Sequence, residues 1–156
     1  MAPATAVPVE RIACQAVPDL PHASWSNALR VGPELIVSGQ TAHPATREAA
    51  QAGAPLGAHA QTLLVLRRIQ ALAEAAGGGV HNILKLVVYV TDIADKDEVG
   101  RARREFFQGQ PYPASTLVAV SALVFPELRV EIDATVRLDA DLRSATVRAG
   151  ADFPAR

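Results

Sequence analysis

The sequence has a single cysteine, Cys14, and almost no net charge over its 156 residues. One cysteine cannot form an intrachain disulfide or a thiolate metal cluster. A net charge of −1 gives no bulk attraction for nucleic acid or for an anionic membrane. The longest apolar runs, such as residues 86–90, are far too short to cross a bilayer. We therefore expect no nucleic-acid or membrane partner.

The N-terminal residues also lack a basic region followed by an apolar stretch, so they do not predict a secretory signal, and we expect a cytoplasmic protein. The content of 49% hydrophobic and 20% charged residues is ordinary for a globular protein. The length suits one domain with a hydrophobic core. We predict one domain over residues 1–138, with a loose N-terminal arm, and a variable tail over residues 139–156.

Hydrophobic spacing predicts two helices. Between Ala58 and Ala76, apolar residues recur at spacings of three and four, and the glycines at 77–79 end the pattern. A second helix is predicted from Asp95 to about Phe107, because Asp95 stands three residues before Glu98 as in a capping box.

The remaining β-prone runs predict strands. In the last run, Val130, Ile132 and Ala134 alternate with charged residues, so one face of that strand should pack against the helices. The order of strands and helices predicts an α+β layer with two helices on one sheet face. The other face must then meet water or another subunit. The predicted strands cover residues 11–15, 35–39, 83–91, 115–120 and 130–138.

Six segments, in this order and spacing, resemble the Rid/YjgF family of reactive-intermediate deaminases. They cover most of residues 22–138 and include a Ser-Gly-Gln turn and an Ala-Ala-Gly helix end. The segments are residues 23–28, 37–40, 61–77, 85–92, 106–114 and 130–134. The resemblance implies a chorismate-mutase-like fold with a mixed β-sheet, assembled as a homotrimer with clefts between subunits. It also implies hydrolysis of enamines or imines, such as 2-aminoacrylate, to keto acids and ammonia without a cofactor.

The resemblance assigns roles to four residues. Glu131 matches the glutamate that orients water, and Ser38 matches the turn serine near the ligand. Trp25 replaces a tyrosine that closes the cleft, so apolar cover is kept and the phenolic hydroxyl is lost. Leu117 stands where a cysteine often lies. We therefore predict Glu131 as the catalytic residue and the other three as substrate-binding residues.

The main departure from the family is Ser115, which stands where most of its deaminases carry a carboxylate-binding arginine. An arginine holds a carboxylate through two parallel charge-assisted hydrogen bonds, whereas a serine offers one neutral donor. Arg129, two residues before Glu131 and on the same predicted face, is the candidate replacement. We add Ser115 and Arg129 to the predicted substrate site. The change favours a substrate other than a simple 2-imino acid.

Each of these residues also has a structural interpretation. Glu131 lies on an alternating charged strand and would serve equally as half of a salt bridge, and Ser38 would cap a turn. Ser115 would be an ordinary strand residue. The four histidines show no His-x-x-x-His spacing, so the sequence predicts no metal site. His22 and His43 lie near the predicted cleft loops, and either would supply a base near neutral pH.

Two functions from different classes follow. The first is a cofactor-independent enzyme that hydrolyses or rearranges an imine or enamine, in a specialised catabolic or biosynthetic pathway. The alternative is a non-catalytic trimeric module that binds a metabolite, which the loss of the arginine favours. RNA cleavage, an activity also reported in the family, is disfavoured by the near-neutral charge and by the lack of a basic, aromatic-lined face.

Overall fold

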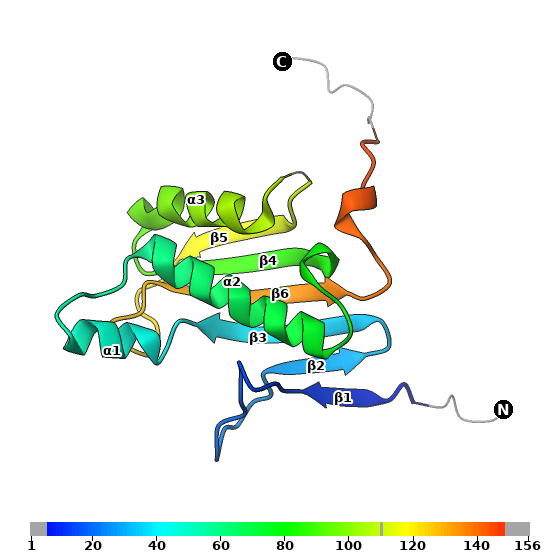
Figure 1. Cartoon of the computed structure of the whole chain (residues 1–156), viewed down its shortest axis with the longest axis horizontal. Helices are drawn as coiled ribbons and strands as arrows, with labels where there is room; N and C mark the ends of the chain where they lie inside the picture. The colour runs from blue at the N-terminus through cyan, green and yellow to red at the C-terminus, as the bar shows by residue number, and fades with distance from the viewer. Residues whose placement is uncertain (1–5, 110, 149–156) are drawn as a thin grey trace.

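A computed structural model describes residues 6–109 and 111–148 of the chain. Six strands form one mixed sheet in the order β1-β2-β3-β6-β4-β5 (Figure 1). Neighbouring strands are antiparallel, except that β4 and β5 are parallel. The strands are β1 (Val9–Ile12), β2 (Ala28–Val31), β3 (Glu34–Thr41), β4 (Ile83–Val90), β5 (Ala114–Ala119) and β6 (Val130–Arg137).

The helices lie in front of the sheet in Figure 1, and α2 packs on β3 and β6. They are α1 (Ala45–Gln51), α2 (Ala58–Ala75) and α3 (Lys96–Phe107), with short 3₁₀ helices η1 (Val80–Asn82), η2 (Ile93–Asp95) and η3 (Leu142–Ser144). The α+β fold class and the two long helices are confirmed. The prediction of only two helices was incomplete, because α1 has seven residues and is too short to show a clear helical period.

The core lies between the sheet and α2. On β6, Val130, Ile132, Ala134 and Val136 are buried, which confirms that the apolar face of this strand meets the helices. From α2, side chains such as Leu66, Ile69 and Leu72 are fully buried against it. Each such side chain contributes roughly 1.5–3 kcal/mol to the free energy of unfolding, because folding removes it from water.

The opposite face of the sheet carries polar side chains, and we call it the open face. It is defined by the cross-strand partners Glu131 and Tyr89, Asp133 and Val87, and Thr135 and Lys85. All six of these residues are half-buried. In Figure 1 the open face is turned away from the viewer.

Several local predictions were wrong. The strand predicted at residues 11–15 is β1 at Val9–Ile12, and β2 was not predicted. Asp95 does not cap α3, because its side chain makes no capping hydrogen bond and instead binds Arg129. The strand predicted at 35–39 does not end at Gly39 but continues to Thr41, with an irregular register between Val37 and Gln40. A β-bulge accommodates an extra residue while the strand continues. The sequence shows a glycine at this position but does not show whether it ends the strand or lies in a bulge.

The ends of the predicted domains lie partly outside the described residues. Residues 1–5 of the predicted arm and 149–156 of the predicted tail are not described. In the described part of the tail, η3 packs near η1, and Asn82 donates hydrogen bonds to the carbonyl oxygens of Arg137 and Ala140. None of the described helices is long and apolar enough to cross a membrane.

Candidate functional site

The carboxylate of Glu131 lies directly over Gly39 in the bulge of β3. A Cβ atom on Gly39 would collide with Oε1, Cδ and Cγ of Glu131. The neighbouring register pair, Thr41 with Glu131, places the base of the side chain on the same strand pair. Glycine at position 39 therefore makes room for this carboxylate on the open face.

Ser38 connects the bulge to the loop that carries Trp25. Its hydroxyl donates a hydrogen bond of 2.6 Å to the carbonyl oxygen of Ser26, and its amide donates one of 3.0 Å to that of Asn27. Trp25 itself is 54% exposed, which is unusual for so large an apolar ring. Ser38 thus connects the bulge at Gly39, over which Glu131 lies, to the loop that carries Trp25.

The electrostatic environment of Glu131 favours its protonated form. Burial raises the pKa of Glu131, and the nearby negative charge of Asp133 raises it further. Asp133 also accepts a hydrogen bond of 3.4 Å from the hydroxyl of Tyr89, and its charge raises the pKa of Tyr89. Within residues 6–109 and 111–148, no side chain or backbone group donates a hydrogen bond to the Glu131 carboxylate. Glu131 is therefore a half-buried carboxylate without an ion-pair partner in the described chain.

Ser115 and Leu117 lie apart from this neighbourhood. Both are on β5, an edge strand separated from β6 by β4, which corresponds to about 10 Å between strand axes. They pair with Leu86 and Val88, whose side chains are buried on the helix side. Leu117 accordingly packs against the core, and Ser115 is exposed. In a single chain, these two residues and Glu131 therefore face opposite sides of the sheet.

Arg129 lies just before β6 and is held by Asp95. Its Nε and Nη2 donate hydrogen bonds of 2.9 and 2.7 Å to the two carboxylate oxygens of Asp95. This pairing raises the pKa of Arg129. The side chain is 45% exposed, and its Nη1 makes no hydrogen bond to the described residues. One edge of the guanidinium thus remains open to a ligand.

Gln61 was not among the predicted site residues, yet it fixes the segment that leads into β6. This fully buried side chain donates to the carbonyl oxygens of Leu56 (2.8 Å) and Glu127 (3.0 Å). It also accepts a hydrogen bond of 2.8 Å from the amide of Arg129. The sequence signal was a polar residue on the apolar side of α2, in line with Val65 and Ile69.

The two candidate histidines differ in environment. His22 is exposed, with a backbone φ of 68°. His43 follows β3, and its ring contacts Phe125 with the ring centroids 4.5 Å apart. Its Nδ1 is buried and has no hydrogen-bond partner within the described part of the chain. Among those residues, no group of three or more His, Cys, Asp or Glu side chains is arranged to hold a metal ion.

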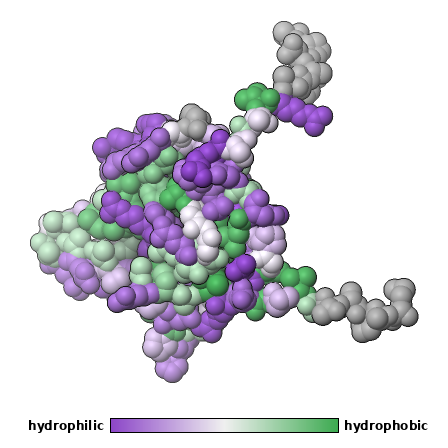
Figure 2. Space-filling model, turned by 45° about the vertical axis from the view of Figure 1, so that its right-hand side comes forward, coloured by the Kyte–Doolittle hydropathy of each residue, from purple (hydrophilic) through white to green (hydrophobic). Residues whose placement is uncertain are grey.

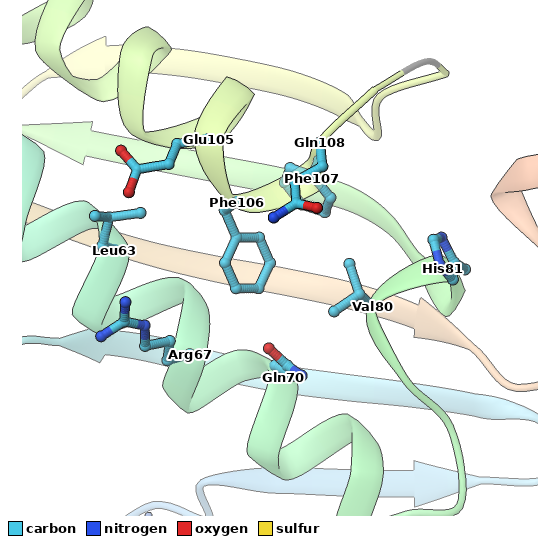
Figure 3. Close-up of a pocket in the computed structure, with 9 residues that line it drawn as sticks. All are labelled: Leu63, Arg67, Gln70, Val80, His81, Glu105, Phe106, Phe107 and Gln108. Atoms are coloured by element: carbon cyan, nitrogen blue, oxygen red, sulfur yellow. The ribbon is translucent and has the colours of Figure 1, made fainter.

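A groove of about 550 Å³ runs between α2, α3 and η1, and Figure 3 shows Phe106 between Arg67 and Gln70 of α2 and Val80 of η1. None of the predicted site residues lines it. The outer surface mixes hydrophobic and hydrophilic residues over short distances (Figure 2). Glu131 and the other predicted site residues therefore lie outside this groove.

Comparison with known proteins identifies the family. The model of the Endoribonuclease L-PSP family matches residues 16–138. A RutC family protein from Sinorhizobium fredii is 38% identical over 116 residues, which are 73% of this chain and 86% of the relative. A 2-iminobutanoate/2-iminopropanoate deaminase from Dermatophagoides farinae is 28% identical over 119 residues, 76% of this chain and 89% of the relative.

Solved structures agree with this result. A crystal structure of a Pseudomonas aeruginosa protein of unknown function is 66% identical, with a TM-score of 0.88, and the match covers 90% of this chain and 99% of that one. A YjgF/YER057c/UK114 family member from Mycobacterium tuberculosis is 34% identical, with a TM-score of 0.61, over 72% of this chain and 86% of that one. The chain belongs to the Endoribonuclease L-PSP family, which contains the Rid/YjgF proteins.

Proposed function

We propose that this protein hydrolyses an imine or enamine, in a cleft between the subunits of a cytoplasmic homotrimer, with Glu131 as the catalytic residue. The observation that carries the proposal is the half-buried Glu131 carboxylate, which lies over Gly39 on the open face and has a raised pKa. A carboxylate with a raised pKa is a stronger base than an ordinary glutamate and also a competent acid nearer neutral pH.

The reaction needs one water molecule and no redox partner. Glu131 takes a proton from water as the water oxygen forms a bond to the imine carbon, and the protonated Glu131 then gives this proton to the nitrogen. In the second step the carbinolamine hydroxyl gives its proton to Glu131, which passes it to the nitrogen as the C–N bond breaks, and the products are a carbonyl compound and ammonia. An enamine enters the same route after a proton is added to its carbon. Because Glu131 lacks an ion-pair partner in the described chain, it is free to exchange protons in this way.

The arrangement of the other predicted residues supports a site shared between subunits. Ser115 and Leu117 face the helix side of β5, whereas Glu131 faces the open side of β6. One chain therefore does not bring these residues together, and a cleft that uses them all requires a neighbouring subunit. A trimer that covers the open face would also remove its half-buried polar side chains from water.

Substrate binding in this proposal differs from that of the relatives named as deaminases. The Dermatophagoides farinae relative is named for two imino acids, which carry a carboxylate. Here Ser115 offers one neutral hydroxyl, and Trp25 and Leu117 offer apolar contact. Arg129 keeps only its Nη1 edge for an anionic group. We therefore propose a substrate with a weaker anionic group or none next to the imine.

The name of the family model refers to an endoribonuclease, but the observed surface gives little support to RNA cleavage. Glu131 and Asp133 place two acidic groups at the centre of the open face, where they would repel phosphodiesters. The chain also has a net charge of −1 and only 4% aromatic residues for base stacking.

The decisive variant is Glu131→Gln, which keeps the side-chain volume and removes the base. We expect loss of about 10²–10⁴-fold in the rate of ammonia release, the usual contribution of general acid–base catalysis. Glu98→Gln, on the exposed surface of α3, is the matched control and should keep full activity. If the native protein binds imines but releases no ammonia from any of them, the alternative of a metabolite-binding module replaces this proposal.

A further inference from the structure

A smaller cavity of about 260 Å³ lies between the middle of α2 and the segment that follows β3. Its walls are partly apolar and partly basic. No acidic side chain lines it, and it does not include any residue of the site proposed above. The lining residues are Ala16, Ala42, His43, Pro44, Ala45, Leu64, Arg67 and Arg68.

Arg68 is a half-buried cation that has no carboxylate partner among residues 6–109 and 111–148. Its guanidinium donates only to neutral oxygens, at 3.3 Å to Oε1 of Gln40 and at 3.4 Å to the carbonyl oxygen of His43. Both bonds are long for a charged donor. Burial lowers the pKa of Arg68, and the nearby thiol of Cys14 opposes this effect only in part. Because buried charges in proteins are ordinarily paired, Arg68 is suited to bind an anion.

Two further polar side chains, Arg67 and His43, line the cavity. Arg67 is exposed and forms no ion pair with the described residues, and it lines both this cavity and the larger groove that Figure 3 shows. His43 keeps its Nδ1 buried without a partner while its ring is held against Phe125. The nearby carboxylate of Glu127 interacts with His43 as well, but it forms its ion pair with Arg47 at 3.0 Å and does not line the cavity.

We propose that this cavity is a second binding site, for a small organic carboxylate whose short apolar chain contacts the alanine, proline and leucine side chains. Arginine side chains match the two oxygens of a carboxylate, and the cavity volume lies just below the range of drug-sized ligand sites. The site is on the helix side of the sheet, whereas Glu131 is on the open face. The proposal is therefore independent of the proposed reaction.

Calorimetric titration tests the binding with butyrate as the probe. Butyramide has the same shape without the charge, and inorganic phosphate has the charge without the apolar chain. We expect saturable binding of butyrate that butyramide does not reproduce and that phosphate reproduces only weakly. Arg68→Gln should weaken butyrate binding at least about tenfold, which corresponds to about 1.4 kcal/mol. Arg101→Gln, which removes an equal charge from the exposed surface of α3, should leave binding unchanged.

Amide chemical shifts locate the probe. Butyrate should perturb residues 42–46 and 64–68 in both the wild type and Glu131→Gln. If Arg68→Gln does not fold, the exposed Arg67→Gln carries the same test, with binding again reduced. The proposal is overturned if butyrate does not saturate, if butyramide binds equally well, or if the shifts concentrate around Ser38, Gly39 and Glu131.

Discussion

At the scale of single residues, the site depends on the contact between Gly39 and Glu131. The carboxylate is half-buried on the open face because residue 39 has no side chain. Burial raises the pKa of this carboxylate, and the nearby negative charge of Asp133 raises it further. Within the described chain, Glu131 therefore does not form the salt bridge that the structural interpretation of its strand suggested, and in our proposal it is free to transfer protons.

Gly39→Ala tests this contact. The added methyl group must displace the Glu131 side chain, so we expect a loss of stability of about 1–3 kcal/mol, as for other overpacked positions, and a large loss of ammonia release. Gly79→Ala is the control, because a Cβ there has no neighbour within 4 Å and its φ of −171° is extended backbone. Urea unfolding and the activity assay measure both effects. Unchanged stability and activity in Gly39→Ala would contradict the described position of Glu131.

The raised pKa of Glu131 predicts a pH-dependent effect of Glu131→Gln on stability. Folding disfavours the ionised carboxylate, so Glu131 contributes most to stability when it is protonated, and this contribution is lost as the pH rises through its raised pKa. We expect Glu131→Gln to unfold at a higher temperature than the wild type near pH 7. The difference should vanish as the pH falls towards the ordinary glutamate value of 4.5. A variant that is less stable at neutral pH would show that the native carboxylate has a stabilising partner.

At the scale of elements, the entry into β6 is held from two helices. Gln61 of α2 bonds the backbone of Glu127 and Arg129, and Asp95, just before α3, holds the Arg129 side chain. These contacts fix the start of the strand that carries Glu131, so the helix layer sets the position of a group on the other face of the sheet.

Gln61→Met keeps the volume of the side chain and removes its three hydrogen bonds. Three partly buried backbone groups then lose their partner, so we expect a loss of stability of about 2 kcal/mol. Gln70→Met, on the same helix, is the matched control, since Gln70 bonds only the exposed Glu74 and should change stability by less than about 0.5 kcal/mol. Equal effects of the two changes in thermal unfolding would show that the hydrogen bonds of Gln61 do not stabilise the entry into β6.

Sequence patterns predicted the elements better than their contacts. The strict alternation of β6 showed which of its residues are buried, and the glycines at 77–79 showed where α2 ends. By contrast, the partner of Asp95 lies 34 residues away in Arg129, and local spacing suggested a helix cap instead. The opposite orientation of Ser115 and Glu131 depends on strand order and register, which one sequence does not specify.

At the scale of the whole molecule, our proposal requires a homotrimer for two reasons. The open face carries half-buried polar side chains, and Ser115 and Leu117 face the opposite side of the sheet from Glu131. We predict that light scattering coupled to size exclusion will give a mass of about 49 kDa, three times the 16.4 kDa of one chain. A monomeric mass at micromolar concentration would contradict the proposed cleft between subunits. Glu131→Gln should keep the trimeric mass, so that its loss of activity is chemical and not structural.

The most direct test of the central claim is the rate of ammonia release from a panel of freshly generated imines, with and without a carboxylate, in the presence of the native trimer. The account predicts that at least one imine is hydrolysed about 10²-fold or more above its spontaneous rate, and that Glu131→Gln loses this acceleration. It also predicts that the preferred imine is not 2-iminopropanoate, because Ser115 lacks the double hydrogen bond of an arginine. Spontaneous rates for every imine, or full activity in Glu131→Gln, would contradict it.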